Sequence, residues 1–203
     1  MGSSVVICIP AFNEEKKIAS VIDDVNHHGD VFVFDNNSTD KTVALSVKSG
    51  AKIVSVKNQG YDSVIESISY FFLHSNYTKL IIIDGDGEVG VNKIQESIQL
   101  LDKFDAVMGA RSSIKRISEK IVCLLFSILF GVKDIYCGFK CFKKNGINPK
   151  YVSNTFGTSI FKKGASVFNQ PVTIEYRDGD SRLGKGLSLS YRLLVGGIKG
   201  LIR

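Results

Sequence analysis

The stretch that decides the fold is Leu80–Glu88, which reads LIIIDGDGE. Its first four residues form a continuous apolar run, which is typical of a strand buried on both faces of a parallel sheet. Three carboxylates follow at alternate positions, Asp84, Asp86 and Glu88, so an extended chain points them the same way. Their mutual repulsion favours binding of a hard cation. The three histidines lie far away in the sequence, so the pattern predicts an all-oxygen site for Mg²⁺ or Mn²⁺. A solvated acidic turn is the alternative for this segment alone.

Outward from this strand, short β-rich runs alternate with helical patterns. Strands are expected at 5–9, 31–34, 53–56, 80–83 and 106–108, and helices at 14–25, from Ser38 or Thr39 to 47, at 61–73 and at 92–101. This alternation predicts an α/β fold with a mostly parallel central sheet and helices on both faces. The chain of 203 residues is long enough for one such domain.

The second half of the sequence is less regular. It predicts a long apolar helix over 114–130, mixed loop and short strand over 136–144, a strand over 172–176 and a helical tail over 187–203. The longest apolar run, 121–132, is shorter than the about 18 residues of a membrane span. We also expect no secretory leader, because residues 3–10 are a short run without a basic lead.

The two halves of the chain carry opposite charge. Residues 1–100 hold 8 Lys and Arg against 13 Asp and Glu, whereas residues 101–203 hold 18 against 7, so the net charges are −5 and +11. The acidic half suits a metal, and the basic half suits an anionic partner such as nucleic acid, a membrane surface or a phosphorylated substrate. The spacing of the four cysteines matches no zinc pattern, which favours reduced apolar cysteines in a cytoplasmic protein.

Polar residues follow each of the first four predicted strands. They are Asn13 and Glu14, then 35–38, then 58–60, then 84–88. Ligands of open parallel sheets bind beyond the carboxyl ends of the strands. We therefore expect these four segments to form one binding edge.

The same segments carry a resemblance to a known family. IPAFNEE (9–15), DNNSTDKT (35–42), NQGY (58–61) and DGD (84–86), in this order and spacing across residues 5–111, resemble the family-2 glycosyltransferases with a GT-A fold. The resemblance implies a single Rossmann-like GT-A domain over 1–203, with a nucleotide-sugar-binding half at 1–110 and an acceptor-binding half at 111–203. It implies that Asp84 and Asp86 hold the metal on the diphosphate, and that the loop from Pro10 to Glu14 and Asp35 hold the base and ribose. The full set expected at the nucleotide sugar is Pro10, Ala11, Phe12, Asn13, Glu14, Asp35, Asn37, Gly60, Asp84, Gly85, Arg182 and Lys185.

The second half is similar to the polyprenyl-phosphate branch, which includes dolichyl-phosphate mannose and glucose synthases. The similarity rests on Gly109-Ala110-Arg111, on DIYCGFK (134–140) and on RLGKGLS (182–188). Ala110 and Cys137 stand where this branch commonly has Ser, and Lys140 where it has Arg. The resemblance implies inverting transfer of a sugar from a UDP- or GDP-linked donor to a polyprenyl phosphate.

The pattern of acidic residues agrees with a phosphate acceptor. A hydroxyl acceptor needs a general base. Apart from the Asp178-Gly-Asp180 turn and isolated Asp134, Glu119 and Glu175, the pair of acidic residues expected for that role is missing between 94 and 203. A lipid monophosphate is largely dianionic at pH 7 and can attack unaided. We expect Arg111, Arg116 and Lys140 to bind that phosphate. Asp134 is expected to orient these cations or, with a hydroxyl acceptor, to act as the base, so that Asp86, Asp134 and Arg111 are the candidate catalytic residues.

Other classes of function stay open at this stage. The chain could transfer a sugar to a hydroxyl of a saccharide, or it could be an inactive nucleotide-sugar-binding module. Nucleic-acid binding is not expected, because exposed aromatics interleaved with cations are missing. A nucleotidyltransferase would open with a Gly-rich loop, which PAFNEE (10–15) is not.

The charge pattern of the C-terminal tail suggests where in the cell the protein is located. Lys185, Arg192, Lys199 and Arg203 fall on one helical stripe, while Leu187, Leu194, Ile198 and Leu201 spread over another side. A basic amphipathic helix of this kind lies at an anionic membrane surface, although a last helix packed on the domain would explain the same pattern. We expect a peripheral protein on the cytoplasmic face of the membrane.

Overall fold

A seven-stranded sheet forms the centre of the computed structural model, which describes residues 4–87, 91–114, 116–147 and 164–173. In chain order the strands are β1 (Val5–Ala11), β2 (Asp30–Asp35), β3 (Lys52–Ser55), β4 (Lys79–Ile82), β5 (Ala106–Arg111), β6 (Lys140–Lys143) and β7 (Val167–Val172). Across the sheet their order is β3-β2-β1-β4-β6-β5-β7. β6 runs antiparallel to β4 and β5, and the other neighbours pair in parallel. The predicted α/β fold with a mostly parallel sheet is confirmed.

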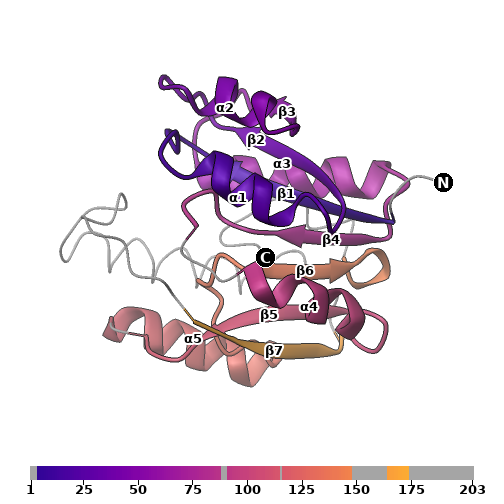
Figure 1. Cartoon of the computed structure of the whole chain (residues 1–203). Coiled ribbons are helices and arrows are strands. Elements are labelled where there is room, and N and C mark those ends of the chain that lie inside the picture. Colours follow the sequence, from indigo (N-terminus) through magenta and orange to yellow (C-terminus); the bar gives the residue numbers. More distant parts are fainter. Residues whose placement is uncertain (1–3, 88–90, 115, 148–163, 174–203) are drawn as a thin grey trace.

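Helices cover both faces of this sheet (Figure 1). They are α1 (Ile18–Val25), α2 (Thr42–Lys48), α3 (Tyr61–His74), α4 (Ile94–Leu100) and α5 (Ile117–Phe130), with short 3₁₀ turns η1 (Val91–Lys93) and η2 (Lys144–Gly146). The apolar side chains of α1, α2 and α4 join one core cluster, and those of α3 and α5 join the cluster on the other face. Each helix buries residues three and four positions apart, because that spacing forms a stripe. None of the helices in the described residues has the length and apolarity needed to cross a bilayer.

Several element boundaries differ from those expected. The first helix begins at Ile18 rather than at 14, and the long helix begins at Ile117 rather than at 114. The second helix begins at Thr42, since Ser38 and Thr39 bind the loop after β1 instead of capping it. The strand β7 (Val167–Val172) shares only Val172 with the strand expected at 172–176. Residues 174–203, which include most of that expected strand and the expected tail helix, lie outside the described residues.

The short strand β6 joins the two halves of the chain. Its first residue, Lys140, pairs with Ile82 of β4 and with Met108 of β5. Because β6 is antiparallel to both, its start lies at the edge of the sheet where β4 and β5 end. The segment that precedes it, 134–139, is thereby held beside the loop that follows β4.

Candidate functional site

The carboxyl ends of the parallel strands meet at one edge of the sheet, as expected. Ala11 at the end of β1 pairs with Asp35 at the end of β2, and Asp35 pairs with Ser55 of β3. The backbone N–H of Gly85 donates to the carbonyl of Pro10 at 3.4 Å, so the loop after β4 lies against the end of β1. The loops that carry most of the predicted nucleotide-sugar residues therefore line one edge.

The loops after β1 and β2 hold each other in place. The N–H of Asn13 donates to Ser38 Oγ at 2.9 Å, and Asn13 Oδ1 accepts the N–H of Thr39 at 2.8 Å. The N–H of Glu14 donates to Thr42 Oγ1 at 2.7 Å. Asn13 has a φ of +54°, which Asn tolerates better than most residues. Pro10, Ala11 and Phe12 precede this clasp, and the Phe12 side chain is about half exposed at the edge.

Asn36 links the loops after β2 and β3, and it was missing from the predicted site. Its Nδ2 donates to the carbonyl of Asn58 at 2.9 Å, and its Oδ1 accepts the N–H of Gly60 at 2.8 Å. The neighbouring Asp35 is buried, and its carboxylate accepts the N–H of Ser38 at 3.3 Å. Asn37 is exposed and has a φ of +64°, a backbone conformation that Asn adopts more readily than most residues. In the sequence, Asn36 stood out only as part of the polar segment 35–38 and of the motif at 35–42, between two expected ligands.

Asp84 and Asp86 lie directly after β4 with their side chains partly buried. Burial of the Tyr61 hydroxyl, followed by the negative charge of Asp84, raises the pKa of Tyr61 well above its ordinary value, and Asp86 adds to the same effect. Tyr61 is the first residue of α3, and the influence of both carboxylates on its hydroxyl shows that the three groups are near one another. The sequence did not predict this neighbour. Oxygen donors of this kind fit Mg²⁺ or Mn²⁺.

A complete metal site is not visible within the described residues. In the part of the chain that the structure describes, no three His, Cys, Asp or Glu side chains gather in an arrangement that could hold a metal. Asp84 and Asp86 supply two carboxylates, while the predicted third ligand, Glu88, lies outside the described residues, as do Arg182 and Lys185. The roles predicted for these three residues stay predictions.

The segment before β6 forms a wall directly behind Asp84. A Cβ placed on Gly138 would overlap Asp84 Oδ2 and lie only 2.5 Å from its Cγ. A Cβ on Gly109 would likewise lie 2.5 Å from the Sγ of Cys137. The Asp84 carboxylate therefore packs against bare backbone, and a side chain at position 138 would displace it.

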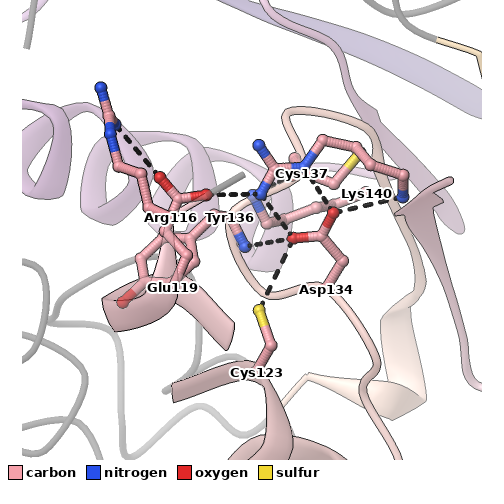
Figure 2. A network of polar contacts seen from close by, with 8 residues as sticks. Arg116, Glu119, Cys123, Asp134, Tyr136, Cys137 and Lys140 are labelled. Atoms are coloured by element: carbon pink, nitrogen blue, oxygen red, sulfur yellow. Dashed lines mark hydrogen bonds and ion pairs between the residues drawn. The ribbon is translucent and has the colours of Figure 1, made fainter. Parts of the chain in front are cut away.

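Four charged residues form a network beside this wall, with Asp134 at its buried end (Figure 2). Arg111 Nε donates to Asp134 Oδ2 at 2.6 Å and Arg111 Nη2 to Asp134 Oδ1 at 2.9 Å. Arg111 Nη2 also reaches Glu119 at 3.2 Å, and Arg116 Nη1 donates to Glu119 at 3.1 Å. Asp134 is 1% exposed and Arg116 is the most exposed member. The network thus leads from the interior behind the sheet edge to the surface at the start of α5.

Both Asp134 oxygens are occupied in this network. Oδ1 also accepts the N–H of Tyr136 at 3.2 Å and lies 3.8 Å from the Sγ of Cys123, and Oδ2 accepts the N–H of Arg111 at 3.2 Å. Burial disfavours the charged guanidinium, but the hydrogen bonds and charge of Asp134 raise the pKa of Arg111 above its ordinary value. The geometry favours the first of the two roles expected for Asp134, orienting the cations, over that of a base.

Lys140 lies deeper than expected for a residue that binds an acceptor. Its side chain is 2% exposed, and Nζ donates to the carbonyl of Cys137 at 2.6 Å. Burial lowers the pKa of Lys140, and the carboxylates of Asp84 and Asp134 oppose that shift. The structure does not bring Lys140 to the surface with Arg116, so its contact with an acceptor phosphate stays a prediction. Lys140 instead lies near both the partly buried carboxylate of Asp84 and the buried carboxylate of Asp134.

The sequence profile of glycosyl transferase family 2 matches residues 6–152. This chain belongs to glycosyl transferase family 2. The match covers both the strand-end loops and the segment before β6, so both sides of the site belong to the family domain. The family-2 chain is a glycosyltransferase that takes its sugar from a nucleotide-sugar donor.

Relatives of this family-2 glycosyltransferase agree with the fold. An uncharacterized protein of Methanocaldococcus jannaschii is 29% identical over 203 residues, covering 85% of this chain and 89% of that protein. A dolichyl-phosphate beta-glucosyltransferase of Trichomonas vaginalis is 22% identical over 173 residues, covering 67% of this chain and 50% of that protein. Glucosyl-3-phosphoglycerate synthase from Mycobacterium tuberculosis, solved with Mn²⁺, UDP-glucose and phosphoglyceric acid, superposes with a TM-score of 0.72 at 18% identity over 97% of this chain and 79% of that chain. The last likeness confirms the expected GT-A fold.

Proposed function

We propose that this family-2 glycosyltransferase transfers a sugar from a UDP- or GDP-linked donor to a polyprenyl phosphate, with inversion. The observation that carries the proposal is the network of Arg111, Arg116, Asp134 and Glu119 beside the Asp84 loop. It combines two guanidinium groups, which suit a phosphate, with two carboxylates that are already ion-paired. A hydroxyl acceptor needs a free general base, whereas a phosphate dianion attacks without one.

On the donor side, Asp84 and Asp86 would hold Mg²⁺ or Mn²⁺ against the diphosphate, with Glu88 as a further candidate. A bound divalent metal neutralises the charge that grows on the leaving diphosphate. Support for a metal comes from the partly buried pair of carboxylates and from the Mn²⁺ in the Mycobacterium tuberculosis neighbour. The clasped loops after β1 and β2 would fix the nucleotide, and Arg182 and Lys185 remain candidates for the diphosphate.

On the acceptor side, Arg116 is the residue that reaches the surface, and Arg111 lies behind it. Glu119 holds the Arg116 guanidinium at 3.1 Å and would keep it extended toward the phosphate. Asp134 orients Arg111 through two parallel hydrogen bonds, an arrangement that leaves little rotational freedom. We further propose that the protein works on the cytoplasmic face of the membrane, where a lipid acceptor is presented.

Acceptor competition tests the proposal. The full chain is incubated with labelled UDP- and GDP-sugars and with a short prenyl phosphate, the matching prenyl alcohol or phosphoglycerate. Label should enter the prenyl phosphate alone. Label in the alcohol would mean that a general base operates, and Asp134 would be its first candidate. Label in phosphoglycerate alone would indicate a water-soluble acceptor like the one bound in the Mycobacterium tuberculosis neighbour.

The variant Arg116→Gln sharpens this test. Loss of a charged hydrogen bond worth about 1.5 kcal/mol or more should raise the KM for prenyl phosphate about tenfold or more, with the donor KM unchanged. Lys103→Gln is the matched control, because Lys103 is an exposed cation that follows α4, away from the loops of the site. Equal KM values in the two variants would remove Arg116 from the acceptor site.

A further inference from the structure

The helix α5 is apolar on two opposite faces. Counted at about 100° per residue, the buried side chains Val122, Cys123 and Phe126 fall within one sector about 100° wide. A second apolar sector, about 140° wide, covers the other side of the helix. It consists of Ile117, Ile121, Leu124, Leu125, Ile128 and Leu129, which are between 37% and 75% exposed.

This exposed face, which we call the α5 outer face, differs from scattered apolar exposure. Six large aliphatic side chains lie together along the four turns of one helix, whereas Val47 and Tyr70 are exposed singly on α2 and α3. A contiguous apolar patch on a soluble domain marks a site of association.

The charges that border the α5 outer face are positive. Arg116 and Lys120 lie at its start, and exposed Lys133 follows its end. Within α5 the one carboxylate is Glu119, which is buried and ion-paired with both Arg111 and Arg116. An apolar strip bordered by cations is complementary to a surface with an apolar interior and anionic headgroups.

The same charges disfavour other occupants. If a second copy packed its own α5 antiparallel on this face, Lys133 would lie against the Arg116 end of that copy. A 14-residue helix is about 21 Å long, so the area of one of its faces is well below the roughly 800 Å² that each partner buries in a stable interface. The chain's own segment 181–203 carries Arg182, Lys185, Arg192, Lys199 and Arg203 without a carboxylate, so it repels the same border.

We propose that the α5 outer face docks on an anionic lipid bilayer surface. The inference rests on the proposed function for its purpose, because Arg116 at the start of α5 would then meet the acceptor phosphate at the level of the headgroups. The apolar side chains enter the boundary between headgroups and acyl chains, and Lys120 and Lys133 contact the headgroups. The docked helix lies in the plane of the membrane surface beside the open edge of the site.

Vesicle flotation of the full chain tests the docking. The triple variant Ile121→Gln, Leu124→Gln, Ile128→Gln changes only exposed positions, and Val47→Gln with Tyr70→Gln is the control. The parent and control proteins should float with phosphatidylglycerol-containing vesicles, and the triple variant should bind at least tenfold more weakly. The proposal is overturned if the triple variant floats as well as the parent protein, or if the parent protein floats equally well with neutral phosphatidylcholine vesicles. It is also overturned if sedimentation velocity shows that the parent protein is a dimer and the triple variant is a monomer.

A second readout separates docking from acceptor chemistry. Transfer to a short, water-soluble prenyl phosphate without vesicles should be the same in the parent and triple variants, because the outer face does not contact the reacting groups. Loss of that transfer in the triple variant would place these side chains in the acceptor site and overturn a pure docking role. If neither protein glycosylates prenyl phosphate while flotation still depends on the outer face, the acceptor proposal fails and the docking surface stands.

Discussion

Replacement of Gly138 by Ala should damage the donor site through a single methyl group. The new Cβ would lie 2.5 Å from Asp84 Cγ, and carbon atoms in good contact lie about 3.5 Å apart or more. The Asp84 carboxylate must therefore move by about 1 Å. A misplacement of about 1 Å at a reacting centre can lower a rate about 100-fold, which corresponds to about 2.7 kcal/mol of activation free energy.

The assay is kcat/KM for transfer at varied Mn²⁺ and donor concentration, together with Mn²⁺-dependent binding of the nucleoside diphosphate. Gly146→Ala is the control, since its Cβ would lie 2.6 Å from the carbonyl of Asp105, at the opposite end of β5 from the site. Both variants should lose stability, but only Gly138→Ala should lose Mn²⁺-dependent binding. If Gly138→Ala keeps the parent kcat/KM, or if both variants lose it equally, then Gly138 does not position Asp84.

Three further expectations concern the metal, the buried network and the thiols. Chelation should abolish transfer and Asp86→Asn should lower kcat by several orders of magnitude with an unchanged unfolding curve; full activity in excess chelator would exclude a metal. Asp134→Asn should lower the free energy of unfolding, measured in urea, by about 3–5 kcal/mol, because it leaves Arg111 partly buried without its counter-charge. The control Asp102→Asn, at an exposed ion pair, should lower it far less. Equal free energies of unfolding for the two variants would contradict the reasoning. Burial raises the pKa of Cys123 and of Cys137 to about 11, so the folded state favours both neutral thiols. The stability that this preference contributes is fully present below pH 9 and should be lost as the pH rises from 9 to 11. A thiol reagent at pH 8 should therefore label no cysteine of the folded chain and all four in denaturant, since all four are buried.

The local sequence was sufficient for the first half of the site. Each strand there is followed directly by its polar loop, and parallel pairing of consecutive βα units brings those loops to one edge. Asp84, Asp35 and Asn13 could be placed in this way, because the order of the chain and the hydrophobic pattern fix which end of each strand carries them. The same reasoning located helix faces, since the 3.6-residue period shows which side chains are buried.

The second half of the site depended on contacts between residues far apart in the chain. The sequence at 134–140 does not show that Lys140 would pair with both β4 and β5, or that Gly138 would pack against Asp84. A short strand inserted antiparallel between two others has no hydrophobic period that reveals its neighbours. For the same reason Lys140 was expected at the surface with Arg116, and Glu119 was not expected at all.

The sequence by itself determined the α/β class, the acidic cluster that follows β4 and the basic character of the second half, since these follow from residue type and local period. Only the tertiary structure decided which charges neutralise one another, because Arg111 and Asp134 lie 23 residues apart in the chain, with α5 between them. It also decided which apolar face of α5 is exposed, because a helix that is apolar on two faces does not show in its sequence which of them is buried. Which apolar surface is covered depends on the space that the rest of the chain leaves, and that is a property of the folded molecule.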